Sequence, residues 1–299
     1  MKKIWIIILN WNWYDDTIEC IESLLNNSYK NIEIILIDNA SKNDEWKKLQ
    51  HFFQDKITFI QNDKNSWFAW WCNIWMKKAL EIWVDYIMLF NNDAVAKNWF
   101  IEYLLESLES NKKIWIIWPS ITYYNSDKIW FAWWNINLFF WASVHKFKWK
   151  NIEILQWLNF YETEYVSWCC ILIKKEVIEK IWLLDKEYFA YNEEVDFCYR
   201  AKKVWYKCFI EPKSIIEHKK SASAWNKWSN SFSELQAYLI ARNWVLFWKK
   251  NLDWFIKYWY LFTQYTILPI LRIIFQIRNF KVFKSYISWL LNKKCWKIN

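Results

Sequence analysis

The chain of 299 residues is 55% hydrophobic and 24% charged, which excludes an intrinsically disordered protein and leaves room for one large or two small domains. Its formal net charge of +9 lies entirely in residues 249–299, where ten Lys and Arg residues stand against one acid, so residues 1–248 are neutral. We therefore expect no nucleic-acid partner for the main body of the chain.

The first part of the chain alternates between apolar runs and helical patterns. The runs predict buried strands at residues 4–9, 32–37, 57–60 and 86–90. Apolar residues recur at helical spacing from Tyr14, over 69–82 and over 98–110. This alternation predicts βαβ units, and hence an α/β protein with a mostly parallel, Rossmann-like sheet flanked by helices. Residues 1–12 are interpreted as the first strand rather than a signal peptide.

The pattern is less regular after residue 113. Further strands are predicted at 114–118, 165–173, 206–210 and 215–218, and helices at 175–181 and 193–204. Residues 119–160 are irregular and rich in strand-like sequence, and residues from 231 onward are helical and aromatic. We predict a catalytic domain over 1–230, with halves at about 1–112 and 113–230, and a helical tail over 231–299.

Tryptophan and glycine have abnormal counts, because the chain has 29 Trp and no Gly. Ordinary usage is roughly 7% Gly, or about 21 residues in a chain of this length. Many of the tryptophans lie in polar, turn-like contexts, as at 10–13 and 67–71, where glycine is expected. We infer that most Trp stand for Gly, as when UGA codons that specify glycine are read as tryptophan. A truly Trp-rich chain is the alternative; Trp130, Trp244, Trp248 and Trp254 have aromatic or helical neighbours and fit genuine tryptophan.

Cysteine usage bears on the compartment. The chain has seven cysteines, an odd number, and no Cys-x-x-Cys pair. This pattern argues against both a disulfide framework and a zinc site, and it favours a reducing compartment.

Polar side chains follow two of the predicted strands. Asp38 ends the strand at 32–37, and Asn91, Asn92 and Asp93 end the strand at 86–90. Ligands of open α/β sheets bind beyond the carboxyl ends of the strands. A carboxylate there suits a divalent cation, and amides suit the hydroxyls of a ligand. Asp38 is also able to accept a hydrogen bond from the imide of uracil or thymine. A helix cap is the alternative for Asp38, and a polar turn in which Asp93 caps the next helix is the alternative for the group at 91–93.

A second acidic group begins the predicted helix at 193–204. Glu193 and Glu194 are adjacent, so they point about 100° apart on a helix. Neighbouring carboxylates raise each other's pKa, which suits a general base. An exposed acidic first turn is the alternative. His218, which ends a predicted strand, fits a structural role unless other ligands converge on it.

Several motifs together resemble glycosyltransferase family 2 over about residues 3–250. They are IILNWNW at 7–13, IDNAS at 37–41, NSWFAWWCNIW at 65–75, FNND at 90–93, VSW at 166–168, IWLLD at 181–185 and YNEEVDFCYR at 191–200. The resemblance is to the rhamnosyltransferase-like branch that builds cell-surface polysaccharides, and it implies the GT-A fold. Almost every unusual Trp in these segments stands where the family has Gly.

The resemblance implies a role for each matching residue. It places the nucleotide sugar against Asn10, Asp38, Asn73, Asn91, Asn92 and Arg200. It implies that Asp93 and His218 hold Mg²⁺ or Mn²⁺ against the diphosphate. Glu194 matches the general base, with Glu193 and Asp196 as alternatives. The chain departs from the family twice: Asn91 replaces the first acid of the Asp-x-Asp motif, and Glu194 replaces an Asp.

The function implied is inverting transfer of a sugar, with rhamnose as a candidate, from a nucleoside-diphosphate sugar. The acceptor would be lipid-linked or a polysaccharide, in synthesis of the cell wall or envelope. A non-catalytic nucleotide-sugar or carbohydrate-binding GT-A module is the alternative. A nucleotidyltransferase is disfavoured because no basic, Gly-rich triphosphate loop follows the first strand.

The basic tail indicates the surroundings of the enzyme. Residues 258–277 are largely apolar but include Pro269 and Arg272, which disfavour a membrane span. We predict an interfacial anchor on anionic lipid, which makes the enzyme a cytoplasmic protein that is peripheral at the inner face of the cell membrane. A helical cap packed on the enzyme is the alternative.

Overall fold

The computed structural model describes residues 1–65, 68–81, 83–132, 134–137, 142–188, 190–219, 234–252, 254–267, 270, 284 and 287. The chain divides into two compact units. Unit 1 comprises Met1–Leu184 and Phe197–Lys220, and unit 2 comprises Asp185–Asp196 and Ser221–Asn299. The domain boundary predicted near residue 230 lies outside the described residues.

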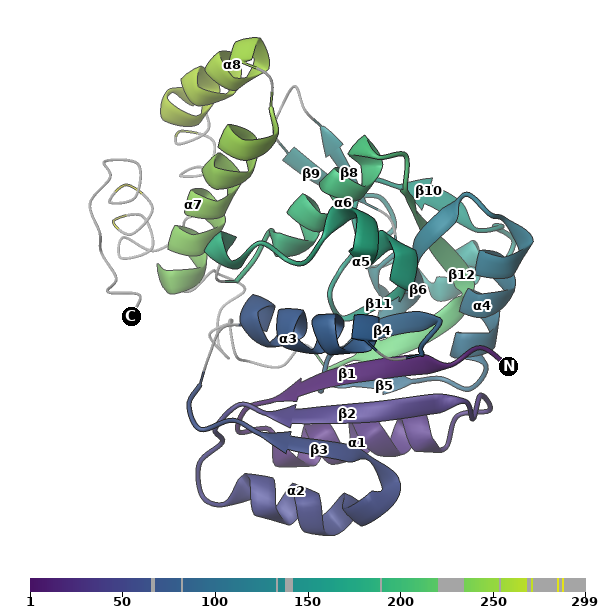
Figure 1. The fold of residues 1–299 in the computed structure, drawn as a ribbon. Helices are drawn as coiled ribbons and strands as arrows, with labels where there is room; N and C mark the ends of the chain where they lie inside the picture. The colour runs from purple at the N-terminus through teal and green to yellow at the C-terminus, as the bar shows by residue number, and fades with distance from the viewer. Residues whose placement is uncertain are drawn as a thin grey trace. The chain divides into compact units, whose positions relative to one another are not determined.

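Unit 1 is built on a sheet with the strand order β10-β12-β6-β11-β4-β1-β2-β3, to which β5 and β7 are added at the side (Figure 1). Its strands are β1 (Ile4–Asn10), β2 (Ile32–Asp38), β3 (Thr58–Gln61), β4 (Tyr86–Phe90), β5 (Ala94–Ala96), β6 (Ile114–Tyr123), β7 (Ile129–Phe131), β10 (Tyr161–Thr163), β11 (Cys170–Lys174) and β12 (Lys207–His218). Strands β8 (Trp134–Asn137) and β9 (Ala142–His145) form a separate hairpin.

The strand directions follow from the connections. Strands β3, β2, β1 and β4 run parallel because helices join them, and β6 and β12 run parallel to each other. Strand β11 lies antiparallel between β4 and β6. The central strands are apolar on both faces, as expected of strands covered by helices on both sides. The α/β prediction, with a mostly parallel sheet flanked by helices, is confirmed.

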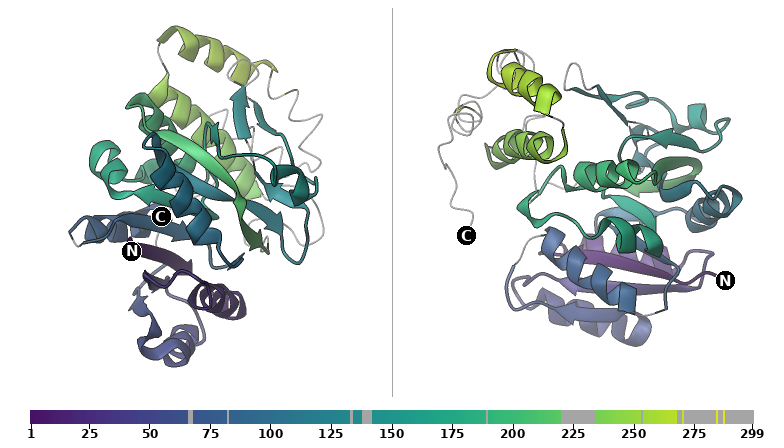
Figure 2. Two further views of the ribbon diagram at one scale, coloured as in Figure 1. Left: turned by 90° about the vertical axis from the view of Figure 1, so that its right-hand side faces the viewer. Right: turned by 45° about the horizontal axis from the view of Figure 1, so that its top comes forward.

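The helices cover the sheet of unit 1 on both faces. They are α1 (Tyr14–Leu25), α2 (Glu45–Phe53), α3 (Phe68–Glu81), α4 (Phe100–Ser110) and α5 (Lys175–Ile181), with short 3₁₀ turns η1 (Gln54–Lys56) and η2 (Ile152–Leu155). Helix α6 (Glu193–Lys203) begins in unit 2 and ends in unit 1. Helix α3 packs over β1 and β4, and beside α5, which packs on β11. Helix α1 lies on the opposite face from α3 (Figures 1 and 2). Unit 2 holds the start of α6 and the elements η3 (Lys186–Tyr188), α7 (Glu234–Asn251) and α8 (Trp254–Tyr265).

Two strand predictions are corrected by the structure. The strand predicted at 165–173 begins only at Cys170, because its ladder with β4 begins opposite Phe90, the last residue of that strand. The strands predicted at 206–210 and 215–218 are one strand, β12, with an irregularity between Glu211 and Ile215. Proline at 212 cannot donate a ladder hydrogen bond, and such residues occur at irregularities of this kind. Within the described residues, no helix is long and apolar enough to cross a membrane.

Candidate active site

Asn10 joins four elements at the carboxyl ends of the parallel strands. The register of β1 and β2 places it beside Asp38, and its side chain is fully buried. Its Nδ2 donates to Asp38 Oδ1 and to Glu45 Oε1, each at 2.9 Å, and its Oδ1 accepts from Thr17 Oγ1 at 2.9 Å. Asn10 therefore connects β1 to β2, α1 and α2. Its predicted contact with the nucleotide sugar stays a prediction.

Asp38 forms a tight turn at the end of β2. Its side chain is fully buried, and Oδ2 accepts a hydrogen bond from the Ser41 backbone N–H at 2.9 Å, while Oδ1 accepts from Asn10. Both carboxylate oxygens are thus used within the protein, in a turn and not in the helix cap that was the alternative from the sequence, since α2 begins only at Glu45. A direct contact of Asp38 with a base stays a prediction.

The two amides after β4 differ in their surroundings. Asn92 donates through Nδ2 to Thr17 Oγ1 at 3.0 Å and lies 3.4 Å from Asn10 Oδ1, so it belongs to the same polar network. Asn91 is held by its backbone, since its N–H donates to the Cys169 carbonyl at 2.9 Å. Among the described residues, no hydrogen bond is recorded for the Asn91 side-chain amide. That amide is therefore the one with free donors and acceptor for a ligand.

The structure brings Asp93 and His218 together. Strand β5 pairs with β12 in a register that sets Ala94 opposite His218, so Asp93 lies beside the imidazole. His218 Nε2 and Asp93 Oδ2 are 3.1 Å apart, and both side chains are about one-tenth exposed. The backbone N–H of Lys219 donates to the Asp93 carbonyl at 2.9 Å. The structure thus places the two side chains in contact, while the metal-binding role that the resemblance implied for them stays a prediction.

The donor atoms of this pair suit a divalent cation. Mg²⁺ and Mn²⁺ prefer carboxylate oxygen, and Mn²⁺ also accepts imidazole nitrogen. Within the described residues, no group of three or more His, Cys, Asp and Glu side chains is placed to hold a metal. A cation at Asp93 and His218 would therefore take its remaining ligands from the diphosphate and water.

A set of charged residues next to this pair did not stand out in the sequence. The Lys219 ammonium group contacts Asp16 at 2.6 Å and also pairs with Glu19, both on α1. The Tyr124 hydroxyl donates to Glu19 at 2.7 Å. These contacts fix the end of β12, which carries His218, to α1. No local pattern could have indicated these contacts, because Lys219 lies 203 residues from Asp16 and Tyr124 lies 105 residues from Glu19.

Asn73 and Arg200 hold one segment of backbone. Asn73 Nδ2 donates to the Leu184 carbonyl at 2.7 Å, and the Leu184 N–H donates to Asn73 Oδ1 at 2.8 Å. Arg200 donates to the carbonyls of Ile181 and Leu183 at 2.5 and 2.9 Å. The two side chains therefore fix residues 181–184. The donor contacts that the resemblance implied for them stay predictions.

In unit 2, Glu193 and Glu194 form a carboxyl pair in which Glu193 is buried, Glu194 is half-buried, and the Oε2 atom of each is shielded from solvent. Their Oε2 atoms have no hydrogen-bond partner within the described part of the chain. Burial raises the pKa of Glu194 to about 7, and burial together with the adjacent carboxylate raises the pKa of Glu193 well above its usual value. The two carboxyls also hydrogen-bond to each other, which favours the proton on Glu193 and the charge on Glu194. The alternative of an exposed acidic turn does not fit this burial.

The turn before this pair is strained. Tyr191 and Asn192 both have a φ of 69°, in the left-handed region. For residues other than glycine, such conformations cost about 1–3 kcal/mol each, and they cluster at functional sites. Asp196, the third acid, has its Oδ1 3.0 Å from Asn251 Nδ2 and 3.4 Å from the Tyr188 hydroxyl. Its carboxylate is thus engaged in the packing of unit 2, unlike the free oxygens of Glu193 and Glu194.

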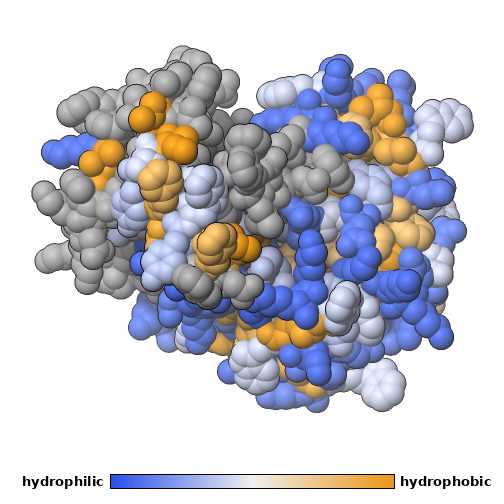
Figure 3. All heavy atoms as spheres, turned by 90° about the horizontal axis from the view of Figure 1, so that it is seen from above, coloured by the Kyte–Doolittle hydropathy of each residue, from blue (hydrophilic) through white to orange (hydrophobic). Residues whose placement is uncertain are grey.

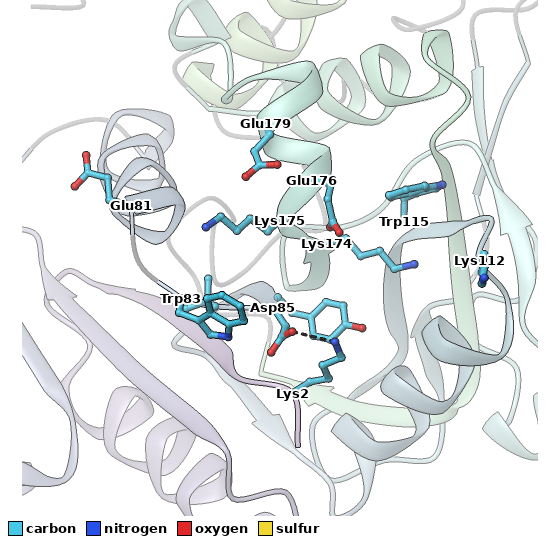
Figure 4. Close-up of a pocket in the computed structure, with 12 residues that line it drawn as sticks. Lys2, Glu81, Trp83, Asp85, Lys112, Trp115, Lys174, Lys175, Glu176 and Glu179 are labelled. Atoms are coloured by element: carbon cyan, nitrogen blue, oxygen red, sulfur yellow. Dashed lines mark hydrogen bonds and ion pairs between the residues drawn. The ribbon is translucent and has the colours of Figure 1, made fainter.

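A pocket of about 800 Å³ lies at the opposite edge of the sheet, where β1, β4 and β6 begin. Its walls carry four lysines and four acids together with Trp83 and Trp115 (Figure 4). The Lys2 ammonium pairs with Asp85 at 3.0 Å, and Lys174 lies 4.9 Å from the Trp115 ring. The pocket is far along the strands from Asp38 and Asp93, so we do not assign it to the candidate site.

Comparison with known proteins identifies related sequences. The family described as glycosyl transferase family 2 matches residues 5–182. The Escherichia coli protein WfaP, a UDP-Glc:alpha-D-GlcNAc-diphosphoundecaprenol beta-1,3-glucosyltransferase, is 36% identical over 63 residues, which cover 21% of this chain and 25% of WfaP. The chain thus matches only a quarter of that relative's length.

Three solved structures have a similar fold. GalNAc-T7 with UDP, GalNAc and Mn²⁺ has a TM-score of 0.69 at 15% identity, over 98% of this chain and 57% of that one. S. aureus TarS has a TM-score of 0.58 at 10% identity, over 96% and 79%. The mannosyltransferase PcManGT from Pyrobaculum calidifontis, with GDP-Man and Mn²⁺, has 0.58 at 9% identity, over 97% and 74%. These likenesses confirm the predicted GT-A fold.

Proposed function

Because this chain belongs to glycosyl transferase family 2, we propose that it is an inverting glycosyltransferase that uses a nucleoside-diphosphate sugar. The observation that carries the proposal is the contact of Asp93 with His218 at the carboxyl edge of the sheet, 3.1 Å apart. A hard acid and an imidazole at this edge suit a diphosphate-bound cation. The free amide of Asn91 supplies hydrogen bonds to the donor.

The reaction needs a base and a stabilised leaving group. Glu194 takes the proton of an acceptor hydroxyl, and the oxygen attacks the anomeric carbon on the face opposite the diphosphate. A carbon–oxygen bond to the acceptor forms while the bond to the diphosphate breaks, which inverts the anomeric configuration. Mg²⁺ or Mn²⁺, held by Asp93 and His218, would supply positive charge against the diphosphate. Glu193 keeps its proton and donates a hydrogen bond to Glu194.

The cation proposal predicts a binding defect that is separate from activity. His218→Ala is expected to weaken Mn²⁺ binding in the presence of UDP at least about tenfold, because one of two protein ligands is lost. Isothermal titration of the full chain with Mn²⁺ measures this. His51→Ala, at an exposed histidine on α2, is the matched control and should bind as the wild type. Equal affinity in all three proteins would remove the pair from the metal site.

The relatives and the resemblance supply candidates for the donor and the acceptor. WfaP is named for UDP-glucose and a diphosphoundecaprenol acceptor, and two structural neighbours were solved with UDP and GDP-mannose. We propose a lipid-linked or polysaccharide acceptor in cell-envelope synthesis. Thymidine-diphosphate rhamnose joins UDP-glucose, UDP-GalNAc and GDP-mannose in a thermal-shift donor screen. The donor that stabilises the chain most, and releases its nucleotide in the presence of an acceptor, identifies the substrate.

A non-catalytic sugar-nucleotide-binding module is the second candidate. Asn91, which stands where the family has an acid, is the observation that favours it. The two candidates differ in turnover. Both would be stabilised by a sugar donor, but a binding module would release no nucleoside diphosphate from any of the four donors.

Helix α8 supports a membrane-surface location. Its aromatic residues Phe255, Tyr258, Trp259, Phe262 and Tyr265 are between 43% and 73% exposed. They recur at helical spacing and so form one stripe. Figure 3 shows orange and pale residues next to one another on the left of the view. With the net charge of +9 in residues 249–299, this stripe suits an anionic lipid surface at the inner face of the membrane.

Vesicle binding tests this location. The double variant Phe255→Ser/Phe262→Ser is expected to bind phosphatidylglycerol vesicles at least about tenfold more weakly, because a buried Phe side chain contributes about 1.5–3 kcal/mol. Co-sedimentation of the full chain with vesicles gives the partition coefficient. Phe52→Ser, which removes an exposed phenylalanine of α2, should leave it unchanged. A double variant that binds as the wild type would leave the helical-cap alternative.

The backbone supports the interpretation that many tryptophans stand for glycine. Trp99, Trp149, Trp182 and Trp205 have φ values between 66° and 69°, a region that glycine adopts without steric cost. Trp182 combines φ 69° with ψ −163°, a conformation that is essentially restricted to glycine. Trp205 follows α6 with hydrogen bonds from Trp205 N to Lys202 O and from Tyr206 N to Ala201 O, both 3.0 Å. This is the Schellman arrangement, whose left-handed position is usually glycine.

A further inference from the structure

The strained turn that leads into the carboxyl pair has one support on α7. The Asn243 side chain is fully buried. Its Nδ2 donates to the carbonyls of Ala190 and Tyr191, each at 2.6 Å, and lies 3.3 Å from that of Tyr188. Both amide protons are therefore used on the backbone of the turn. Without these bonds, the carbonyls would be free to rotate out of the left-handed arrangement.

The acceptor side of the same amide is also fixed. Asn243 Oδ1 accepts from Arg242 Nε at 2.9 Å, and Arg242 Nη2 donates to the Glu187 carbonyl at 2.8 Å. The amide is thus oriented by its neighbour and cannot flip without losing three bonds. Side chains of helix α7 therefore hydrogen-bond to the backbone carbonyls of Glu187, Tyr188, Ala190 and Tyr191, which lie just before Glu193 and Glu194.

We propose that Asn243 is a positioning residue, which holds the turn at 190–192 so that the carboxyl oxygens of Glu193 and Glu194 stay buried and hydrogen-bonded to each other. The proposal rests on the proposed function, in which Glu194 is the base. Asn243 itself touches no reacting atom; it acts through the backbone of the turn. This gives helix α7, which the sequence assigned to the basic tail, a part in catalysis.

The expected consequence is a change in the titration of the pair. The ionisable groups that act on Glu194 are Glu193 next to it and Tyr191 on the turn, whose own pKa is raised to about 12 by burial and by the two carboxylates. The backbone N–H groups of Asn192 and Glu194 also favour the charged form of Glu194. If the turn relaxes, water reaches the pair and the desolvation that raises the pKa of Glu194 is lost.

The experiment compares Asn243→Ala, Asn243→Asp and Asn243→Gln in the full chain. Loss of the Asn243 hydrogen bonds to the turn in Asn243→Ala is expected to lower kcat about 10²-fold, since misplacement of a reacting group by about 1 Å has effects of this size. The KM for the sugar donor should stay within twofold of the wild type. Asn243→Asp keeps the side-chain shape but has no donor, so it should behave as Asn243→Ala. Asn243→Gln keeps the amide and should recover most of the rate. In the first two variants, the midpoint of the rising limb of the pH–rate profile should lie at a lower pH than in the wild type.

A second readout needs no substrate. A carboxyl whose pKa is raised on folding stabilises the protein below its unfolded pKa and loses that contribution as the pH rises through the folded pKa. The urea midpoint of the wild type should therefore fall between pH 5 and pH 8.5, and fall less in Asn243→Ala. Val245→Ala, at a buried α7 residue, is the control for general destabilisation and should keep the wild-type pH dependence.

Two outcomes would overturn the inference. One is Asn243→Ala with the wild-type kcat and pH dependence; the other is a loss of rate equal to that of Val245→Ala with no change in pH dependence. Failure of the proposed function gives a different result: Glu194→Gln would then turn over at the wild-type rate, whatever the rate of Asn243→Ala. If Glu194→Gln is inactive and Asn243→Ala is normal, only the positioning role is wrong.

Discussion

Glu194→Gln is expected to lower kcat about 10³-fold and to change the donor KM less than about twofold. General bases contribute about 10²–10⁴-fold, and the amide keeps the size of the side chain without its proton affinity. In the wild type, the rate should rise with pH through about 7, because burial raises the pKa of Glu194 to about 7 and only the ionised form accepts a proton. Nucleotide release measured from pH 5 to 9 gives both quantities.

The neighbouring acids provide the comparison. Glu193→Gln is expected to lose less rate than Glu194→Gln and to keep the midpoint of the pH profile near that of the wild type, because Glu193 is protonated beside Glu194 and the amide keeps a hydrogen-bond donor. Glu179→Gln, at an exposed acid of α5, should match the wild type. A Glu194→Gln enzyme with near wild-type kcat would transfer the base role to Glu193 or Asp196. A wild type that releases no nucleotide would support the non-catalytic alternative.

Much of the fold was predictable because its signals are local. The strand at 86–90 is a short apolar run between polar residues, and the helix at 175–181 has apolar residues at helical spacing; both have those bounds in the structure. The single strand β12 was not predictable, since its middle reads as a turn and is held in the sheet by β6. Strand β5 is too short to show a pattern and depends on pairing with β12.

The sequence was enough to predict which residue types belong to the candidate site, but not which residues they contact. The sequence placed Asp93 at a strand end, but its contact with His218 depends on the register of two strands far apart in the chain. For Asn73, the family pattern predicted a contact with the nucleotide sugar. In the structure its side-chain amide hydrogen-bonds to the backbone of Leu184. The burial of Glu194 was open, because the spacing of two acids on a helix start says nothing of what covers them.

Replacing three tryptophans that have a left-handed backbone conformation is expected to raise the free energy of unfolding. The triple variant Trp99→Gly/Trp182→Gly/Trp205→Gly is expected to be about 3 kcal/mol more stable, since a non-glycine residue in this region costs roughly 1–2 kcal/mol and glycine gives part of that back as unfolded-state entropy. The three side chains are between 55% and 86% exposed, so little packing is lost. Trp149 is left out because its ring stacks on Tyr123 at 4.3 Å.

Thermal unfolding measures this gain, which should raise Tm by about 6–12 °C for a chain of this size. Trp248→Gly is the matched control: this side chain is buried in α7, so its loss should destabilise by about 3 kcal/mol or more. Mass spectrometry of the protein from its native host tests the origin of the strain, because each glycine in place of tryptophan lowers the mass by about 129 Da, the difference between the side chains. An unshifted mass together with a triple variant no more stable than the parent would show that these tryptophans are native, and that the surrounding structure tolerates their left-handed backbone.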